Sequence, residues 1–249
     1  MFGRSLVRDT RRDARYFDEQ VRHNEEWLEK SRGVIASPDT APNQRRMLRH
    51  AVYRRELELL IARYSRGEPV AALRAAYPRV IDALAEYQQH AGNAAQDFDN
   101  FDAYVLALWI MALAVLLDVG DDQTRRAAQE LGNSRRDAIF DRLLALRLPG
   151  QEETRTLMYP RPYGPLRDAL DASGDEQSQK LTEFLDGWYN GIKAAYWQGS
   201  HTGSDAGYFG YWCFELAAFV KQLGINDSTF ADNLYYPSDL VHYSRGETK

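Results

Sequence analysis

The feature that most constrains the fold is a hydrophobic run without a single charge. It covers residues 104–117 (YVLALWIMALAVLL) and is 14 residues long. A helix that spans a bilayer needs about 20 apolar residues. The run is therefore too short for a membrane span and predicts a central buried helix.

Helical periodicity continues in the sequence on both sides of this run. From residue 70 the apolar positions alternate steps of three and four, which places them on one face of a helix; these positions are Leu73, Tyr77, Val80, Leu84 and Tyr87. Pro78 is expected to kink or split this helix. Further helices are expected at about 4–32, 43–66, 121–132, 134–147, 165–173, 176–198 and 205–223.

No run of alternating β-branched residues is long enough to form a convincing sheet. The fold class we predict is all-α, with about eight to ten helices in two packed helical halves. Residues 148–165 contain four prolines and two glycines and break the helical pattern. We expect an N-terminal part over residues 1–148 and a C-terminal part over residues 149–249.

Charge differs between these two parts. Residues 1–149 hold 23 Lys and Arg against 22 Asp and Glu, whereas residues 150–249 hold 8 against 14. The second part therefore carries a net charge of −6. Such a balance argues against a DNA-binding surface there and favours attraction to a basic partner.

The start of the sequence bears on where the protein acts. Residues 1–17 carry arginines and aspartates but no apolar h-region, so no secretory signal is recognised. The single cysteine, Cys213, excludes an internal disulfide and a cysteine-rich zinc site. We expect a cytoplasmic protein without a membrane partner.

Residues that could bind a metal or a cofactor do not form a convincing set. The chain has no GxxxxGK[ST], GxGxxG or GxSxG motif, and its five histidines are scattered. Asp97, Asp99 and Asp102 precede the apolar run, where acids suit the positive end of a helix dipole. We interpret this triplet as a helix cap, and we expect no metal and no cofactor.

One carboxylate, Glu215, lies inside the apolar stretch GYFGYWCFELAAFVKQLGI at residues 207–225. An unpaired buried carboxylate is unfavourable by several kcal/mol. We expect it to organise a core by pairing with an arginine of the first half and accepting hydrogen bonds from phenols and indoles. The candidate donors are Tyr208, Tyr211, Trp212, Trp188 and Trp197.

Two other functions are weighed against this structural interpretation. An all-α hydrolase-like enzyme would use Glu215 with His201 as an acid oriented against an imidazole. A nucleic-acid-binding protein would use the arginines near the start, although Asp9 and Asp13 interrupt them; these are Arg4, Arg8, Arg11, Arg12 and Arg15.

Three segments resemble one known family. RRDARYFDEQVRHNEEWLEK at residues 11–30, WYNGIKAAYWQGSH at 188–201 and YFGYWCFELAAFVKQLGINDSTFADNLYYPSDLV at 208–241 are similar to the PoNi immunity proteins. That family protects bacteria from PoNe-type polymorphic toxins, which are DNases delivered by secretion systems between competing cells. The resemblance implies an immunity protein without enzymatic activity, and therefore no catalytic residues.

The family motifs fall on particular residues of this chain. The GYW-x-x-E pattern falls on Gly210, Tyr211, Trp212 and Glu215. The YYP-x-D pattern falls on Tyr235, Tyr236, Pro237 and Asp239, with Ser238 at a position where an aromatic residue is expected. The resemblance implies a structural role for these residues and for Tyr16, Phe17 and Trp188.

The resemblance also implies a mechanism. The protein would bind its cognate nuclease toxin stoichiometrically and block the active site or the DNA path, without binding nucleic acid itself. Because a nuclease presents a basic surface to DNA, acidic residues of the second half are the expected toxin interface. The candidates are Asp168, Asp171, Asp175, Glu176 and Asp205.

Overall fold

The structure is a computed structural model that describes residues 7–92, 97–150, 152–203 and 207–244. Ten helices and no strand occur in these residues, which confirms the all-α prediction. None of the described helices is long and apolar enough to cross a membrane.

The chain forms two compact units, and each is described by itself. The first unit combines residues 1–95 with the later segment 199–210, and the second combines residues 96–198 with 211–249. The two parts expected from the sequence, 1–148 and 149–249, are consecutive stretches of the chain, whereas the two units are defined by contacts between residues. The division into those two parts stays a prediction.

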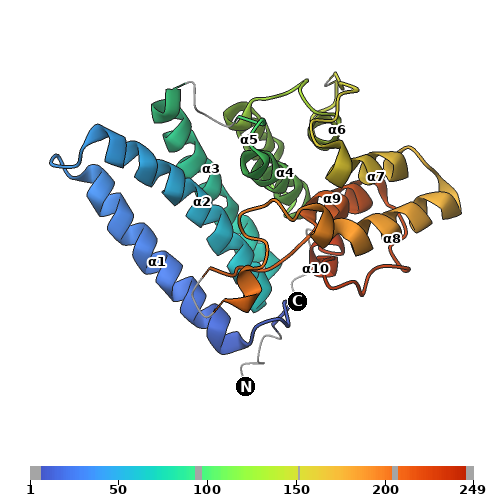
Figure 1. Cartoon of the computed structure of the whole chain (residues 1–249), viewed down its shortest axis with the longest axis horizontal. Coiled ribbons are helices and arrows are strands. Elements are labelled where there is room, and N and C mark those ends of the chain that lie inside the picture. The colour runs from blue at the N-terminus through green and yellow to red at the C-terminus, as the bar shows by residue number, and fades with distance from the viewer. Residues whose placement is uncertain (1–6, 93–96, 151, 204–206, 245–249) are drawn as a thin grey trace. The chain divides into compact units, whose positions relative to one another are not determined.

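Three long helices build the first unit (Figure 1): α1 (Ala14–Ala36), α2 (Pro42–Arg66) and α3 (Val70–Ala91). Helix α1 begins about ten residues later than expected, because the Asp13 carboxylate caps it by accepting from the Tyr16 amide at 2.8 Å. The preceding segment is anchored instead by the Arg8 amide, which donates to the Ser65 carbonyl at 2.9 Å. Pro78 lies inside a continuous α3, so the expected split does not occur.

The second unit is organised around the hydrophobic run. Helix α4 (Phe101–Leu116) is buried at every position from Tyr104 to Leu116, as predicted. It contacts α5, α6 and α9. The remaining helices of the unit are α5 (Asp121–Leu131), α6 (Ala138–Ala145), α7 (Pro160–Leu170), α8 (Gly174–Gly191), α9 (Phe214–Leu223) and α10 (Ser238–Val241).

None of the three aspartates provides the N-cap of α4, which corrects the cap interpretation, although Asp102 does lie in the first turn, where an acid suits the helix dipole. The cap is Asn100, whose side-chain oxygen accepts from the Ala103 amide at 3.1 Å. The three acids have other partners: Asp97 and Asp99 pair with Arg136, and Asp102 accepts from the Tyr196 amide.

The helix expected at 205–223 is shorter in the structure. Residues 207–213 are not helical, and α9 begins only at Phe214. Gly210 has φ 116°, a left-handed conformation that favours glycine. In this segment the backbone satisfies its hydrogen bonds outside a helix, since the Cys213 amide donates to the Tyr235 carbonyl at 2.8 Å.

Candidate functional site

Glu215 lies in the first turn of α9 and is completely buried. The Trp188 indole N–H donates to its Oε1 at 2.7 Å, and the Tyr163 hydroxyl lies 3.4 Å from the same oxygen. Burial raises the pKa of the Glu215 carboxyl, while the Trp188, Trp109 and Tyr163 donors oppose that shift. Phenol and indole donors were expected around this residue, and Trp188 was named among them, whereas Tyr163 and Trp109 were not.

The expected arginine partner is absent, which corrects the pairing predicted for Glu215. In the part of the chain that the structure describes, no Lys, Arg or His forms an ion pair with this carboxylate. A carboxyl group that is buried without a cation favours its protonated form. Glu215 therefore serves as a hydrogen-bonding centre for α7, α8 and α9 rather than as half of a salt bridge.

His201 belongs to the first unit and Glu215 to the second. The His201 carbonyl accepts a hydrogen bond from the Arg12 guanidinium at 2.7 Å. The centroid of the His201 imidazole lies 6.1 Å from the centroid of the Tyr208 ring. The partners of Glu215 all belong to the second unit. The interactions inside each unit therefore give no support to a Glu215 and His201 catalytic pair.

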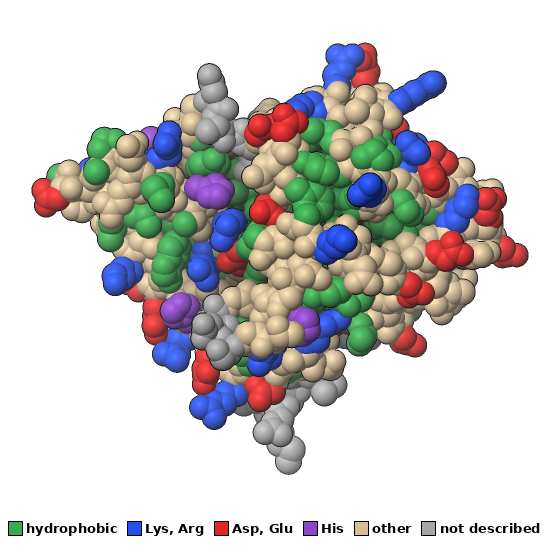
Figure 2. Space-filling model, in the orientation of Figure 1, with side chains coloured by type: hydrophobic (Ala, Val, Ile, Leu, Met, Phe, Trp, Pro, Cys, Tyr) green, Lys and Arg blue, Asp and Glu red, His purple; other side chains and the backbone are tan. Residues whose placement is uncertain are grey.

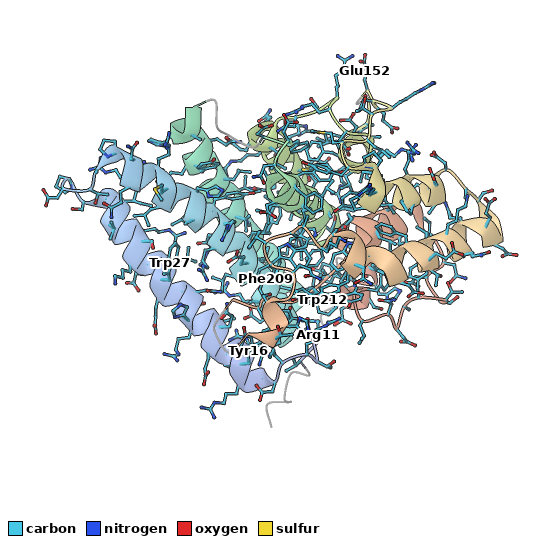
Figure 3. The ribbon with its side chains drawn as sticks, in the orientation of Figure 1. Arg11, Tyr16, Trp27, Glu152, Phe209 and Trp212 are labelled. Atoms are coloured by element: carbon cyan, nitrogen blue, oxygen red, sulfur yellow. The ribbon has the colours of Figure 1, made fainter. Side chains whose placement is uncertain are left out.

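The other aromatic residues of the GYW-x-x-E motif are buried in the second unit. The Tyr211 ring lies 5.3 Å from Trp197 and 4.9 Å from Tyr189, and its hydroxyl lies 3.4 Å from the Trp197 carbonyl. Trp188 stacks at 6.0 Å on Trp197. Trp212 is only 4% exposed (Figure 3). Tyr211, Tyr189, Trp197 and Trp188 form one aromatic cluster next to Glu215.

The YYP-x-D motif leads into α10, which packs against α9. The Tyr236 hydroxyl donates to Asp227 Oδ2 at 2.8 Å, and its ring packs edge-on against Phe230 at 5.2 Å. Pro237 is the N-cap residue of α10, and Asp239 is exposed in the first turn of that helix. Lys221 of α9 then donates to three backbone carbonyls at 2.7–2.8 Å, those of Leu116, Leu240 and Tyr243.

Tyr16 and Phe17 have structural contacts in the first unit (Figure 3 labels Tyr16 on α1). The Tyr16 hydroxyl bonds to both the amide and the carbonyl of Tyr208, at 3.0 and 3.2 Å. Phe17 is fully buried. The Tyr208 hydroxyl donates to the buried Asp9 carboxylate rather than to Glu215. This end of α1 therefore anchors the returning segment 207–210.

The arginines near the start are engaged in contacts inside the first unit. Arg8 donates to the carbonyl of Glu68 at 2.7 Å, Arg12 to that of His201 at 2.7 Å, and Arg11 pairs with Asp9 at 3.3 Å. Arg15 pairs with Glu19 on α1, and Arg4 lies outside the described residues. These contacts give the cluster a structural role and do not favour the nucleic-acid-binding alternative.

Four of the five acids proposed as an interface lie on α7, α8 and the turn between them. Figure 2 shows acidic side chains gathered along the side of the second unit where Figure 1 labels α7 and α8. Asp168, Asp171 and Glu176 are more than half exposed, but each pairs with a cation: Arg167 at 3.0 Å, Arg142 at 2.7 Å and Lys180 at 2.7 Å, respectively. Asp175 is exposed and forms no ion pair with a described residue. Asp205 lies outside the described residues.

Two further acids extend this surface along α8. Glu183 and Asp186 are exposed on the same helix, where Gln179 donates to Glu183 and Asn233 donates to Asp186, each at 2.9 Å. Neither forms an ion pair with a described residue. Glu183 follows Glu176 by seven residues, a spacing that places both on one face of a helix and could have indicated this surface from the sequence. We call Asp168, Asp171, Asp175, Glu176, Glu183 and Asp186 the α7–α8 acidic surface.

Comparisons with known proteins assign the chain to a family. The model described as "PoNe immunity protein (PoNi), N-terminal" matches residues 8–129, and "PoNe immunity proteins (PoNi), C-terminal" matches residues 135–240. The chain therefore belongs to the PoNi family of immunity proteins, and this membership implies immunity to a PoNe nuclease toxin. An immunity protein family favours an inhibitor role without catalysis.

A solved structure supports the fold. Protein PA2201 from Pseudomonas aeruginosa matches with a TM-score of 0.74 and 22% sequence identity. The match covers 94% of this chain and 89% of that protein. No curated protein sequence matches the chain.

Proposed function

We propose that the protein binds a cognate PoNe-type DNase in the cytoplasm and neutralises it stoichiometrically, by covering its active site or its DNA path. This would protect bacteria during competition with toxin-delivering neighbours. Family membership over residues 8–129 and 135–240 is the observation that carries the proposal.

Electrostatics support a role of the second unit in this binding. The α7–α8 acidic surface carries six carboxylates and lies in the part of the sequence with a net charge of −6. A nuclease binds phosphates through basic residues, so a negative surface accelerates encounter with it. Because Arg167, Arg142 and Lys180 neutralise three of these acids, Asp175, Glu183 and Asp186 are the strongest candidates for steering.

Co-expression in bacteria with the nuclease encoded beside it tests the proposal. Cell survival, followed by co-purification of the two proteins in a fixed ratio, is the expected result. Cell death despite folded protein and active nuclease would overturn it. A catalytically inactive nuclease variant, which does not kill cells on its own, is the control for expression and for complex recovery.

A further inference from the structure

A surface groove in the second unit lies between α6, α7 and α9 and has a volume of about 540 Å³. Its apolar side is formed by Leu146, Leu170, Phe219 and Leu223, together with Ala145. Leu223 is 56% exposed, which is unusual for a large aliphatic side chain. The groove thus presents apolar surface that is left open by the described residues of the second unit.

An ion network crosses the other side of the groove. Arg142 donates to Asp171 Oδ1 at 2.7 Å, and its Nε lies 3.5 Å from Glu153 Oε2. The two carboxylates are about half exposed, and their other oxygens, Asp171 Oδ2 and Glu153 Oε1, bond to no described residue. The trio therefore carries a net charge of −1 and offers two carboxylate oxygens at the groove.

The backbone adds negative potential at the same place. The groove residues Ala145, Leu170 and Leu223 are the last residues of α6, α7 and α9. The C-terminus of a helix carries a partial negative charge and leaves carbonyls without helical partners. Three such ends at one groove favour a cation.

The position of Glu153 is fixed by neighbouring buried acids. The Thr154 amide donates to Asp141 Oδ2 at 2.9 Å, and the Met158 amide donates to Asp137 Oδ2 at 2.9 Å. Both aspartates are almost fully buried. These bonds attach residues 154–158 to the start of α6 and to Asp141 within it. They keep the adjacent Glu153 at the rim of the groove.

We infer that this groove receives an Arg or Lys side chain of the partner nuclease, with an adjacent apolar residue of that nuclease against Leu223. The inference rests on the proposed function and specifies one contact between this protein and the nuclease. The occupant is chosen by charge complementarity, since a guanidinium or ammonium group matches both the free carboxylate oxygens and the three helix ends. A nuclease offers such cations on the surface that otherwise binds DNA phosphates.

The double variant Asp171→Asn with Glu153→Gln removes both charges while leaving oxygens that accept from Arg142. We expect its Kd for the co-encoded nuclease to rise at least about tenfold at 0.1 M salt. The matched control is Asp122→Asn with Glu19→Gln, since both acids pair with arginines elsewhere. Its Kd should stay within about twofold of wild type.

The possible results separate the two proposals. If wild type binds the nuclease and the groove variant binds equally well, the groove inference is overturned and the proposed function stands. If folded wild-type protein does not bind the nuclease, both are overturned. Loss of binding by the groove variant alone supports the inference.

A second measurement does not depend on changing the charges. Cys213 is the only cysteine and is buried, so a Leu223→Cys variant provides one reactive thiol. Labelling of this thiol by a maleimide should slow at least about tenfold when the nuclease is saturating, because contact residues are desolvated. A Met47→Cys variant on α2, at a position 71% exposed, is the control and should label at an unchanged rate. Equal labelling of Leu223→Cys with and without nuclease would contradict the inference.

Discussion

The indole N–H of Trp188 donates a 2.7 Å hydrogen bond to Glu215 Oε1 in a fully buried site. This bond joins α8 to the first turn of α9. Because the carboxylate has no cationic partner among the described residues, its role is to accept hydrogen bonds from the aromatic residues around it. We therefore propose that Glu215 of the GYW-x-x-E motif has a structural role in this chain.

Replacement of Glu215 tests that role. Glu215→Ala should lower the free energy of unfolding by about 2–4 kcal/mol, since it leaves the Trp188 donor unsatisfied and opens a cavity. Glu215→Gln should change it by less than about 1 kcal/mol at pH 7, because an amide oxygen accepts the same bonds. Urea denaturation measures both. Equal losses for the two variants would show that the negative charge itself is required.

The raised pKa of Glu215 predicts a pH dependence with a definite sign. An acid with a higher pKa in the folded state stabilises the fold most below its unfolded pKa, about 4.5. That stabilisation is lost as the pH rises through the folded pKa, because the charged form is desolvated. Wild type should therefore lose stability relative to Glu215→Gln as the pH rises from 4.5 to 8. A difference between them that is constant over this range, in urea titrations at several pH values, would contradict the assignment.

Lys221 provides a test of how the end of the chain is held. Lys221→Met removes the donor to the carbonyls of Leu116, Leu240 and Tyr243, which we expect to destabilise the unit by about 2–4 kcal/mol. Amide hydrogen exchange in α10 should accelerate more than that in α4. The control is Lys180→Met on α8, where an exposed pair with Glu176 contributes little to stability. Unchanged exchange in α10 would mean that packing alone holds that helix.

Steering by the α7–α8 acidic surface is tested by charge reversal. Asp175→Lys with Glu183→Lys should slow association with the nuclease by about 3- to 10-fold at low salt, and high salt should reduce the difference. Glu29→Lys with Asp122→Lys makes the same change in net charge at exposed positions on α1 and α5. Stopped-flow association rates compare the pairs. If both pairs slow association equally, net charge rather than this surface controls the encounter.

The sequence was informative where one pattern determines the structure. Uncharged residues 104–117 predict the buried helix α4, and the three-four spacing after Val70 predicts α3. Sequence patterns gave a wrong helix where groups distant in the sequence form the hydrogen bonds of the backbone. The Ser65 hydroxyl donates to the Phe209 carbonyl at 2.7 Å across 144 residues, which helps to keep that segment out of a helix.

Site prediction had a similar limit. The burial of Glu215 could be predicted from its apolar neighbours, but its partner Tyr163 lies in a Pro-rich stretch interpreted as a break. Helix α7 begins at Pro160, where the missing amide hydrogen has no helical partner to lose. Arg142 and Asp171 are 29 residues apart, so no helical spacing could reveal that this candidate interface acid is already paired.

The most direct test of the central claim is a titration of the purified nuclease with this protein while DNA cleavage is measured. Inhibition by binding predicts a linear loss of cleavage that reaches zero at one equivalent, with recovery of a complex in the same ratio. Inactivation by far less than one equivalent would indicate an enzyme. Full cleavage at a large excess of folded protein would contradict immunity by direct binding.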